Sequence, residues 1–198
     1  EQYLAECLDS ILDTKYNEVL EVLAINDGSK DGTLALAREY EARYPEILRV
    51  IDKPNGGWGT VINLAVAEAR GRYFKILDSD DWFSADALEK AISAFDVNTD
   101  CVLFDVLLEW GDRTERYEMP EFNTLTGDEA FRLSLMWQIH GLYMVRASIH
   151  RQFPYDETCR LYSDDNTTRI HYLVSRNVRQ CRGEYHYRQN PQSSTHTV

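Results

Sequence analysis

Three carboxylates crowd into four residues at Asp78-Ser79-Asp80-Asp81, immediately after the apolar segment 73–77. Like charges at this spacing raise one another's pKa unless a cation neutralises them. Oxygen ligands suit a hard cation such as Mg²⁺ or Mn²⁺, which binds one or two carboxylates and completes its shell with substrate phosphates. The cluster therefore predicts a site for a divalent cation and phosphate. The competing interpretation is a solvated acidic turn that caps the next helix.

A second polar segment, residues 26–33 (NDGSKDGT), ends the apolar run 19–25. A carboxylate held in such a loop, here Asp27, can accept a hydrogen bond from a base N–H or a ribose hydroxyl. Asp31 or Thr33 can equally cap the helix that follows. Alone, this segment is a weak signal.

The third segment, residues 55–60 (NGGWGT), opens a helix after a short strand. Its glycines allow the backbone to approach a ligand closely, and helix N-termini favour phosphate. The segment is neither a G-x-G-x-x-G fingerprint nor a Walker loop, because no Gly-Lys-Ser/Thr follows. The competing interpretation is a flexible turn.

The elements that must position these segments alternate between strand and helix. Apolar spacing predicts helices at 3–12, 33–44, 58–70 and after Ser84, and strands at 19–25, 48–51 and 73–77. This order predicts a mostly parallel sheet flanked by helices, with ligands gathering beyond the carboxyl ends of its strands. After residue 100 the regularity weakens: 100–108 and 184–187 are typical of strands, 126–136 and 164–174 of helices, and 143–151 is ambiguous.

Composition narrows the class of partner. The 198 residues include 33 acidic and 21 basic side chains, for a net charge of −12. This charge argues against a nucleic-acid partner and against binding of an anionic membrane by this segment alone. The four cysteines form no C-x-x-C pair, so we expect neither a zinc site nor a disulfide framework. This cysteine pattern favours a protein of the reducing cytoplasm. No apolar run approaches 18 residues. We expect one domain, 1–198.

Taken together, the three polar segments resemble family 2 glycosyltransferases, which have the GT-A fold. The resemblance is strong over residues 1–95 and rests on NDGSKDGT and on KPNGGWGTVINLAVAEARGRYFKILDSDDWF at 53–83. It continues more loosely to residues 188–193, which are similar to a Tyr-Arg-x-x-x-x-Ser ending. The resemblance implies a nucleotide-sugar-binding half at 1–95 and an acceptor-side half at 96–198.

The resemblance also assigns roles to residues. Asp27 is expected to bind the nucleotide base, while Asp78 and Asp80 form the Asp-x-Asp pair that holds ribose, diphosphate and Mn²⁺ or Mg²⁺, with Asp80 the more direct metal ligand. The part of Asp81 stays open. The remaining positions that the resemblance assigns to donor binding are Asn55, Gly57 and Asn63.

A general base is still required, and in this family it is the Asp of an acidic pair that opens a later helix. Asp164-Asp165 occupies that place, and Asp165 aligns with the family's base. Asp164 stands where the family usually has Glu, so which of the two faces the acceptor stays open. The competing interpretation is a pair of acids that complements a helix dipole. His140 and Trp137 are expected on the acceptor side, although such residues are more often structural.

This sequence departs from the family at its start. Members begin with an apolar strand and a Pro-x-Tyr-Asn-like loop, whereas residue 1 already lies in the following helix. We therefore expect the family's first strand to be missing, either because the sequence is a fragment or because another segment fills its place.

The resemblance implies transfer of a sugar, with inversion, from a nucleoside-diphosphate sugar to a saccharide or lipid-linked acceptor. The setting it implies is bacterial surface polysaccharide synthesis in the cytoplasm, with peripheral association at the inner membrane face through other segments. Two alternatives remain. A sugar-nucleotide pyrophosphorylase would need a Gly-rich, basic loop after its first strand, and the other alternative is a non-catalytic, glycosyltransferase-like binding domain.

Overall fold

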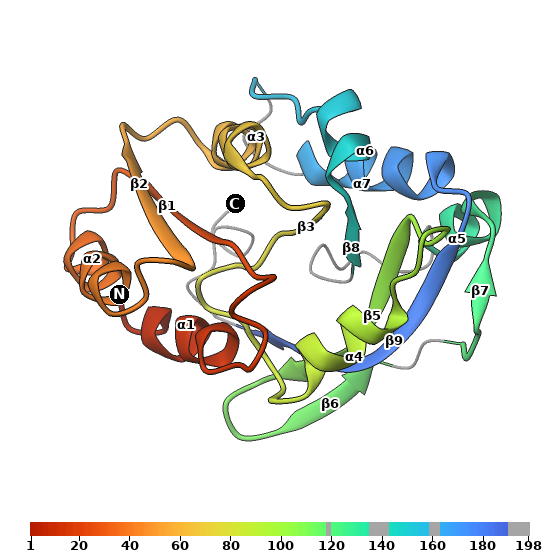
Figure 1. Ribbon diagram of the computed structural model, residues 1–198, viewed down its shortest axis with the longest axis horizontal. Helices are drawn as coiled ribbons and strands as arrows, with labels where there is room; N and C mark the ends of the chain where they lie inside the picture. The colour runs from red at the N-terminus through yellow and green to blue at the C-terminus, as the bar shows by residue number, and fades with distance from the viewer. Residues whose placement is uncertain (118–119, 135–142, 159–162, 190–198) are drawn as a thin grey trace.

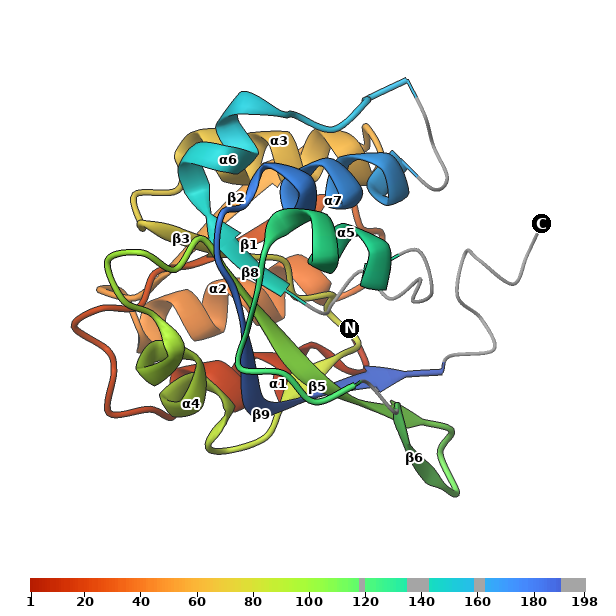
Figure 2. The same cartoon turned by 90° about the vertical axis from the view of Figure 1, so that its right-hand side faces the viewer.

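The computed structural model describes residues 1–117, 120–134, 143–158 and 163–189, with the backbone alone at 134 and 163–166. The helices are α1 (Leu4–Leu12), α2 (Thr33–Arg43), α3 (Trp58–Glu68), α4 (Ala87–Ala94), α5 (Gly127–Ser134), α6 (Ala147–Gln152) and α7 (Ser163–Val174). The strands are β1 (Val22–Asp27), β2 (Leu48–Lys53), β3 (Tyr73–Lys75), β4 (Trp82–Phe83), β5 (Cys101–Glu109), β6 (Thr114–Tyr117), β7 (Thr124–Leu125), β8 (Tyr143–Arg146) and β9 (Val178–Arg188). Strands occupy the middle of the molecule, with α3, α6 and α7 on one side and α1 and α4 on the other (Figures 1 and 2).

The first helix shows how the apolar pattern becomes structure. Leu4, Leu8, Ile11 and Leu12 lie on one face at helical spacing, and all four are buried. This face packs on the main core, which continues through the middle of β5, where Phe104 is fully buried. The helix expected at 3–12 is confirmed.

The first two strands pair in parallel and end together. Their register runs from Val22 opposite Leu48 to Asp27 opposite Lys53. Parallel strands need a crossover connection, and α2 supplies it. As a result, the polar segments that follow the two strands emerge at the same edge, as the alternating pattern predicts.

The larger sheet has the strand order β3-β8-β5-β9-β4, with β6 beside β5 and β7 beside β9. The expectation of mostly parallel strands is wrong here. Among the described residues of this sheet, β5–β9 is parallel, and β3–β8, β5–β8, β4–β9, β5–β6 and β7–β9 are antiparallel. The reason is that regular strand–helix alternation stops after α4, and short connections such as the hairpin between β5 and β6 allow only antiparallel pairing.

The sheet is divided between β1 and β3. Within the described residues β1 pairs only with β2, and β3 pairs only with β8, so the strands form sheets of two and seven. None of the described helices is both long enough and apolar enough to cross a bilayer.

Candidate active site

The acidic turn 78–81 connects β3 to the short strand β4. Its backbone closes on itself, because the Asp81 N–H donates to the carbonyl of Asp78 over 3.0 Å. The Cys7 thiol of α1 donates to the same carbonyl over 3.6 Å. Asp78 and Asp80 are partly exposed, whereas Asp81 is 1% exposed. The turn thus contains two partly exposed carboxylates and one buried carboxylate.

Asp81, whose part the sequence leaves open, anchors the turn. One carboxylate oxygen accepts the hydroxyl of Tyr185, and the other accepts the backbone N–H of Arg188 over 2.8 Å. Burial, with the neighbouring charges of Asp78 and Asp80, raises the pKa of Asp81 to about 7, against these hydrogen bonds. A carboxylate engaged on both oxygens inside the protein holds the turn in place.

Lys75 lies beneath the acidic turn, and sequence reasoning did not single it out. Its ammonium is 4.4 Å from the ring centroid of Tyr185 and donates to the carbonyl of Ile76. Burial lowers the pKa of Lys75 to about 7, although the charges of Asp78 and Asp81 act to raise it. The signal that could have found it is a lysine placed three residues before the acidic cluster in an otherwise apolar strand. It places an amine with a lowered pKa below the carboxylates.

Asp27 organises the loop that follows β2. Its Oδ1 accepts hydrogen bonds from the Lys53 ammonium and, over 2.9 Å, from the Gly56 N–H, while its Oδ2 accepts the Gly57 N–H over 2.9 Å. Partial burial acts to raise its pKa, but Lys53 and the two amides lower the pKa of Asp27 overall. Asp27 is therefore held as an anion at the carboxyl end of β1.

The other predicted donor-binding residues surround this loop. The side-chain amide of Asn55 donates to the Asp27 carbonyl over 3.0 Å. Gly57 begins α3 with a φ of 87°, which glycine adopts without strain. Asn63 lies farther along α3, where its amide donates to the Tyr155 carbonyl and accepts the Tyr155 N–H, each over 2.9 Å. The structure thus gives Asn63 a tethering role between α3 and the segment after α6.

The segment containing α1 contacts both polar regions. The Gly32 N–H, in the loop after β1, donates to the Glu1 carboxylate over 2.7 Å, and Cys7 contacts Asp78 as described above. Convergence of Asp27, Asp78 and Asp80 on one donor cleft remains a prediction, which these shared contacts favour.

The predicted general base lies in α7, whose backbone begins at Ser163. The structure confirms that residues 164 and 165 open a helix, but the side chains of Asp164 and Asp165 lie outside the described part. Trp137 and His140, expected on the acceptor side, also lie outside the described residues.

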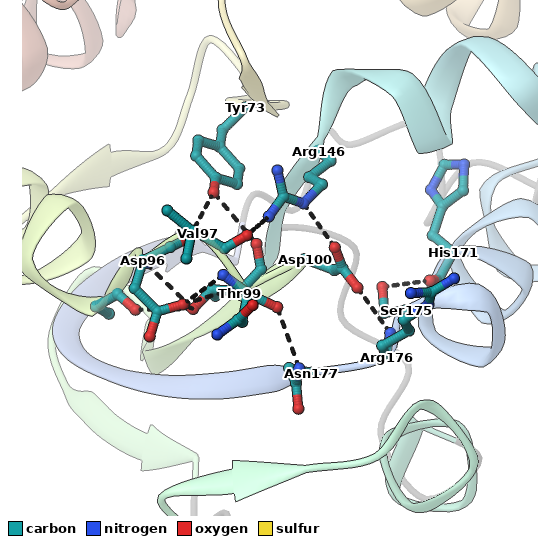
Figure 3. Close-up of polar contacts among 12 residues, drawn as sticks. Tyr73, Asp96, Val97, Thr99, Asp100, Arg146, His171, Ser175, Arg176 and Asn177 are labelled. Carbon is teal, nitrogen blue, oxygen red and sulfur yellow. Dashed lines mark hydrogen bonds and ion pairs between the residues drawn. The ribbon is translucent and has the colours of Figure 1, made fainter.

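The far end of α7 is firmly attached to the sheet (Figure 3). Asp100 accepts the Arg176 backbone N–H over 2.8 Å and the Arg146 Nε–H over 2.6 Å, which joins the end of α7 to β8. The helix is therefore fixed at its C-terminal end, which is the end opposite its first turn.

A buried polar cluster lies under the middle of α7. His171 is 0% exposed, and its Nδ1 lies 2.9 Å from the Tyr143 hydroxyl, which is 3.2 Å from the Tyr155 hydroxyl. His150 is 3% exposed and stacks edge-on against His171, with ring centroids 4.2 Å apart. Within the described residues its Nδ1 has no hydrogen-bond partner. These contacts fix α7 on α6 and β8.

A cleft of about 550 Å³ lies at the opposite ends of β1 and β2 from Asp27 and Lys53. Its lining includes Glu18, Glu46 and Arg70. The glutamates and the ion-paired arginines around it are the features of a solvated surface, and the cleft is remote from the acidic turn. We therefore assign the chemistry to the turn and not to this cleft.

Comparison with known proteins decides the family. A family model described as glycosyl transferase family 2 matches residues 1–155. The chain belongs to this family. The membership agrees with the resemblance carried by the loop of Asp27 and by the acidic turn.

Several relatives of this family 2 chain come from bacteria. The putative glycosyltransferase EpsH of Bacillus subtilis (strain 168) is 33% identical over 112 residues, which are 57% of this chain and 32% of that protein. The uncharacterized glycosyltransferase EpsJ of the same strain is 27% identical over 209 residues, which cover 98% of this chain and 60% of that protein. A chondroitin synthase of Escherichia coli is 38% identical over 103 residues, 51% of this chain and 15% of that protein. The chain thus spans about a third of the length of EpsH and less of the synthase.

Solved structures establish the fold. TarS 1–349 of S. aureus, crystallised in complex with UDP-GlcNAc, superposes with a TM-score of 0.82 at 20% identity, covering 100% of this chain and 58% of that chain. The mannosyltransferase PcManGT of Pyrobaculum calidifontis, in complex with GDP-Man and Mn²⁺, gives a TM-score of 0.69 at 18% identity, covering 97% and 55%. The chain has the GT-A fold of these glycosyltransferases.

The donor set of the acidic turn fits a hard divalent cation. In the described part of the chain, no group of three or more His, Cys, Asp or Glu side chains is arranged to hold a metal ion by itself. Asp78 and Asp80 supply oxygen atoms from two partly exposed carboxylates, and their charges help to raise the pKa of buried Asp81. Mg²⁺ and similar ions bind one or two carboxylates and take their other ligands from phosphates and water. Two partly exposed carboxylates within one turn suit that mode of binding.

Proposed function

We propose that this chain is the catalytic core of a metal-dependent glycosyltransferase that transfers a sugar, with inversion, from a nucleoside-diphosphate sugar to an acceptor hydroxyl. The observation that carries the proposal is the acidic turn itself, in which Asp81 is buried as an anchor while Asp78 and Asp80 are partly exposed. A turn built only to cap a helix would have no need to bury one acid and raise its pKa.

Donor binding is assigned to the two polar loops. Asp27 binds the nucleotide base, and Asn55 and Gly57 shape the loop beside it. Asn63 contributes to donor binding from α3, and Asp78 binds the ribose and diphosphate. Asp80 holds Mn²⁺ or Mg²⁺ against the diphosphate. When bound, the cation offsets the negative charge that develops on the departing nucleoside diphosphate.

Acceptor activation is assigned to the start of α7. Asp165 accepts the proton of the acceptor hydroxyl, and the oxygen attacks the anomeric carbon from the face opposite the departing diphosphate. A single displacement of this kind inverts the anomeric centre. Asp164 stands beside the base, and Trp137 and His140 are assigned to the acceptor side.

The proposed acceptor is a saccharide or a lipid-linked saccharide of a bacterial surface polymer. The relationship to a chondroitin synthase supports a saccharide acceptor. We place the reaction in the cytoplasm, at the inner face of the membrane, and we propose no nucleic-acid partner, in keeping with a net charge of −12.

Calorimetric titration with UDP- and GDP-sugars, with and without Mn²⁺, tests the donor half of the proposal. We expect binding of at least one nucleotide sugar and a tighter complex with metal. Turnover of that donor is then measured with saccharide acceptors, with release of nucleoside diphosphate as the readout. It distinguishes an enzyme from the alternative, a non-catalytic nucleotide-sugar-binding domain. Failure of every nucleotide sugar to bind would refute both readings.

A further inference from the structure

Arg188, the last residue of β9, reaches the acidic turn from a distant part of the chain. The antiparallel register of β4 and β9 sets Trp82 opposite His186 and Phe83 opposite Tyr185. Continued by two residues, this register brings Arg188 beside Asp80. The strand pairing therefore places Arg188 next to the acidic turn.

Two hydrogen bonds join Arg188 to the turn. Its backbone N–H donates to Oδ1 of Asp81 over 2.8 Å, and its Nε–H donates to the backbone carbonyl of Asp80 over 2.8 Å. The described contact of the guanidinium with Asp80 is thus to the main chain and not to the carboxylate. A fixed carbonyl at residue 80 restricts the directions that its side chain can take.

The guanidinium is itself held in place. Its central carbon lies 4.3 Å from the ring centroid of Tyr3 and 4.4 Å from that of Trp82, and Nη2 forms an ion pair with Glu6. Trp82 stacks in turn on His186, with centroids 4.8 Å apart. The side chain of Arg188 is 21% exposed. A planar group between two rings loses little further freedom when it forms directed hydrogen bonds.

We propose that Arg188 is a positioning residue for the acidic turn: it fixes the backbone at Asp80 so that the carboxylates of Asp78 and Asp80 are arranged for the cation and diphosphate of the donor. The inference rests on the proposed function of Asp78 and Asp80. This geometry requires a guanidinium, because Nε bonds to the Asp80 carbonyl, Nη2 pairs with Glu6 and the planar face lies against Trp82, all at the same time.

The test compares Arg188→Met with Arg188→Lys and with a control on the same strand. Met keeps an apolar stem between the rings and the backbone N–H to Asp81, but removes the bond to the Asp80 carbonyl. Arg182→Met is the matched control, since Arg182 also lies on β9 and makes ion pairs with Asp105 and Glu121 at the surface, with its side chain 49% exposed.

Two measurements decide the outcome. In hydrogen exchange without ligand, we expect the Asp81 amide, which bonds to Asp78, to exchange at least about tenfold faster in Arg188→Met than in Arg182→Met. In titrations with UDP, we expect Arg188→Met to lose about tenfold or more of the Mn²⁺-dependent affinity. Where turnover is measurable, the loss should be mainly in KM for the donor. Arg188→Lys should lie between these values, and it replaces Arg188→Met if the latter does not fold.

The two failures are distinguishable. Wild-type exchange at residues 78–81 in the Arg188 variants would overturn the positioning role whether or not nucleotide binds. Fast exchange together with a wild-type protein that binds no nucleotide would keep the role of Arg188 in the turn and refute the proposed function. Fast exchange with unchanged Mn²⁺-dependent affinity would overturn the link between the turn's order and donor binding.

Discussion

Asp27 and Lys53 end two neighbouring parallel strands at the same register position and form an ion pair there. The ammonium shares Oδ1 of Asp27 with the Gly56 N–H, and Oδ2 accepts the Gly57 N–H. An ionised carboxylate offers about four acceptor positions, so the described contacts leave one, on Oδ2. A base edge with a single N–H, such as that of uracil, fits one position. The adjacent N1–H and N2–H of guanine fit two.

The first prediction follows from this count. If Asp27 binds the base, UDP should bind more tightly than GDP, by roughly tenfold. Lys53→Met should narrow the difference, because Oδ1 then gains an open acceptor position. Calorimetric titration of both nucleotides measures the ratio, and Lys30→Met, which removes an exposed lysine of the loop after β1, controls for the lost charge. If the ratio of UDP affinity to GDP affinity were the same in the wild type and in both variants, base recognition through Oδ2 would be contradicted.

The second prediction concerns the cation. Asp80→Ala should abolish Mn²⁺-dependent nucleotide binding and leave the fold intact. Removal of one acid relieves the charge that raises the pKa of Asp81, so the free energy of unfolding should not fall. Titration of UDP with and without Mn²⁺ measures the first effect, and thermal unfolding the second.

Asp86→Asn is the control for this variant. Asp86 precedes α4 and pairs with Lys90 at the surface, outside the turn. The Asp86→Asn variant should bind nucleotide and metal like the wild type. A metal response retained in Asp80→Ala would remove Asp80 from the cation site.

Sequence reasoning succeeded where local pattern decides structure. The helix at α1 and the paired strands β1 and β2 follow from apolar spacing and turn residues, and the loops after them lie where a βαβ order puts them. It failed where partners are distant. The short strand β4 and the hairpin strand β6 have little pattern of their own, and each exists because β9 or β5 offers an edge. The ambiguous segment 143–151 is a strand followed directly by a helix, β8 and α6.

The candidate site shows the same division. The carboxylates of the turn could be identified from their spacing, and so could the loop of Asp27. Lys75 and Arg188 could not be assigned, because their roles depend on contacts across the fold: Arg188 is 107 residues from the acid that its backbone binds. The burial of Asp81 was equally hidden, since nothing in three adjacent acids says which one faces inward.

The third prediction concerns the buried histidines under α7. Burial, together with the charge of His171, lowers the pKa of His150 to about 2, and burial lowers that of His171 to about 4. In the unfolded chain both titrate near 6.5. Below that pH the unfolded state binds more protons, so the free energy of unfolding should fall as the pH drops from about 6.5 towards 4, by about 1.4 kcal/mol per unit for each histidine.

His150→Phe isolates this effect. Nδ1 of His150 has no partner among the described residues, so an apolar ring should cost little there at pH 7. Between pH 7 and pH 5, the variant should lose about 2 kcal/mol less free energy of unfolding than the wild type. Urea unfolding at the two pH values measures the difference, which would vanish if His150 were charged in the folded protein.

The last prediction concerns the base. Asp165→Asn should leave donor binding nearly intact and reduce turnover by about 10²-fold or more, the usual scale for a lost general base. Binding should be spared because the assigned donor contacts all lie in residues 27–81. Single-turnover rates and UDP titration of the same preparation measure the two effects.

Asp164→Asn is the matched control, because it removes the same charge one position earlier in the first turn of α7. It should be the milder change, since the amide keeps nearly the shape of the carboxylate and Asp164 is not the assigned base. Equal and small effects of both substitutions would reduce the pair to acids that complement the helix dipole. Retention of the anomeric configuration would be a stronger objection, because it requires a nucleophile on the opposite face and hence two displacements in place of one.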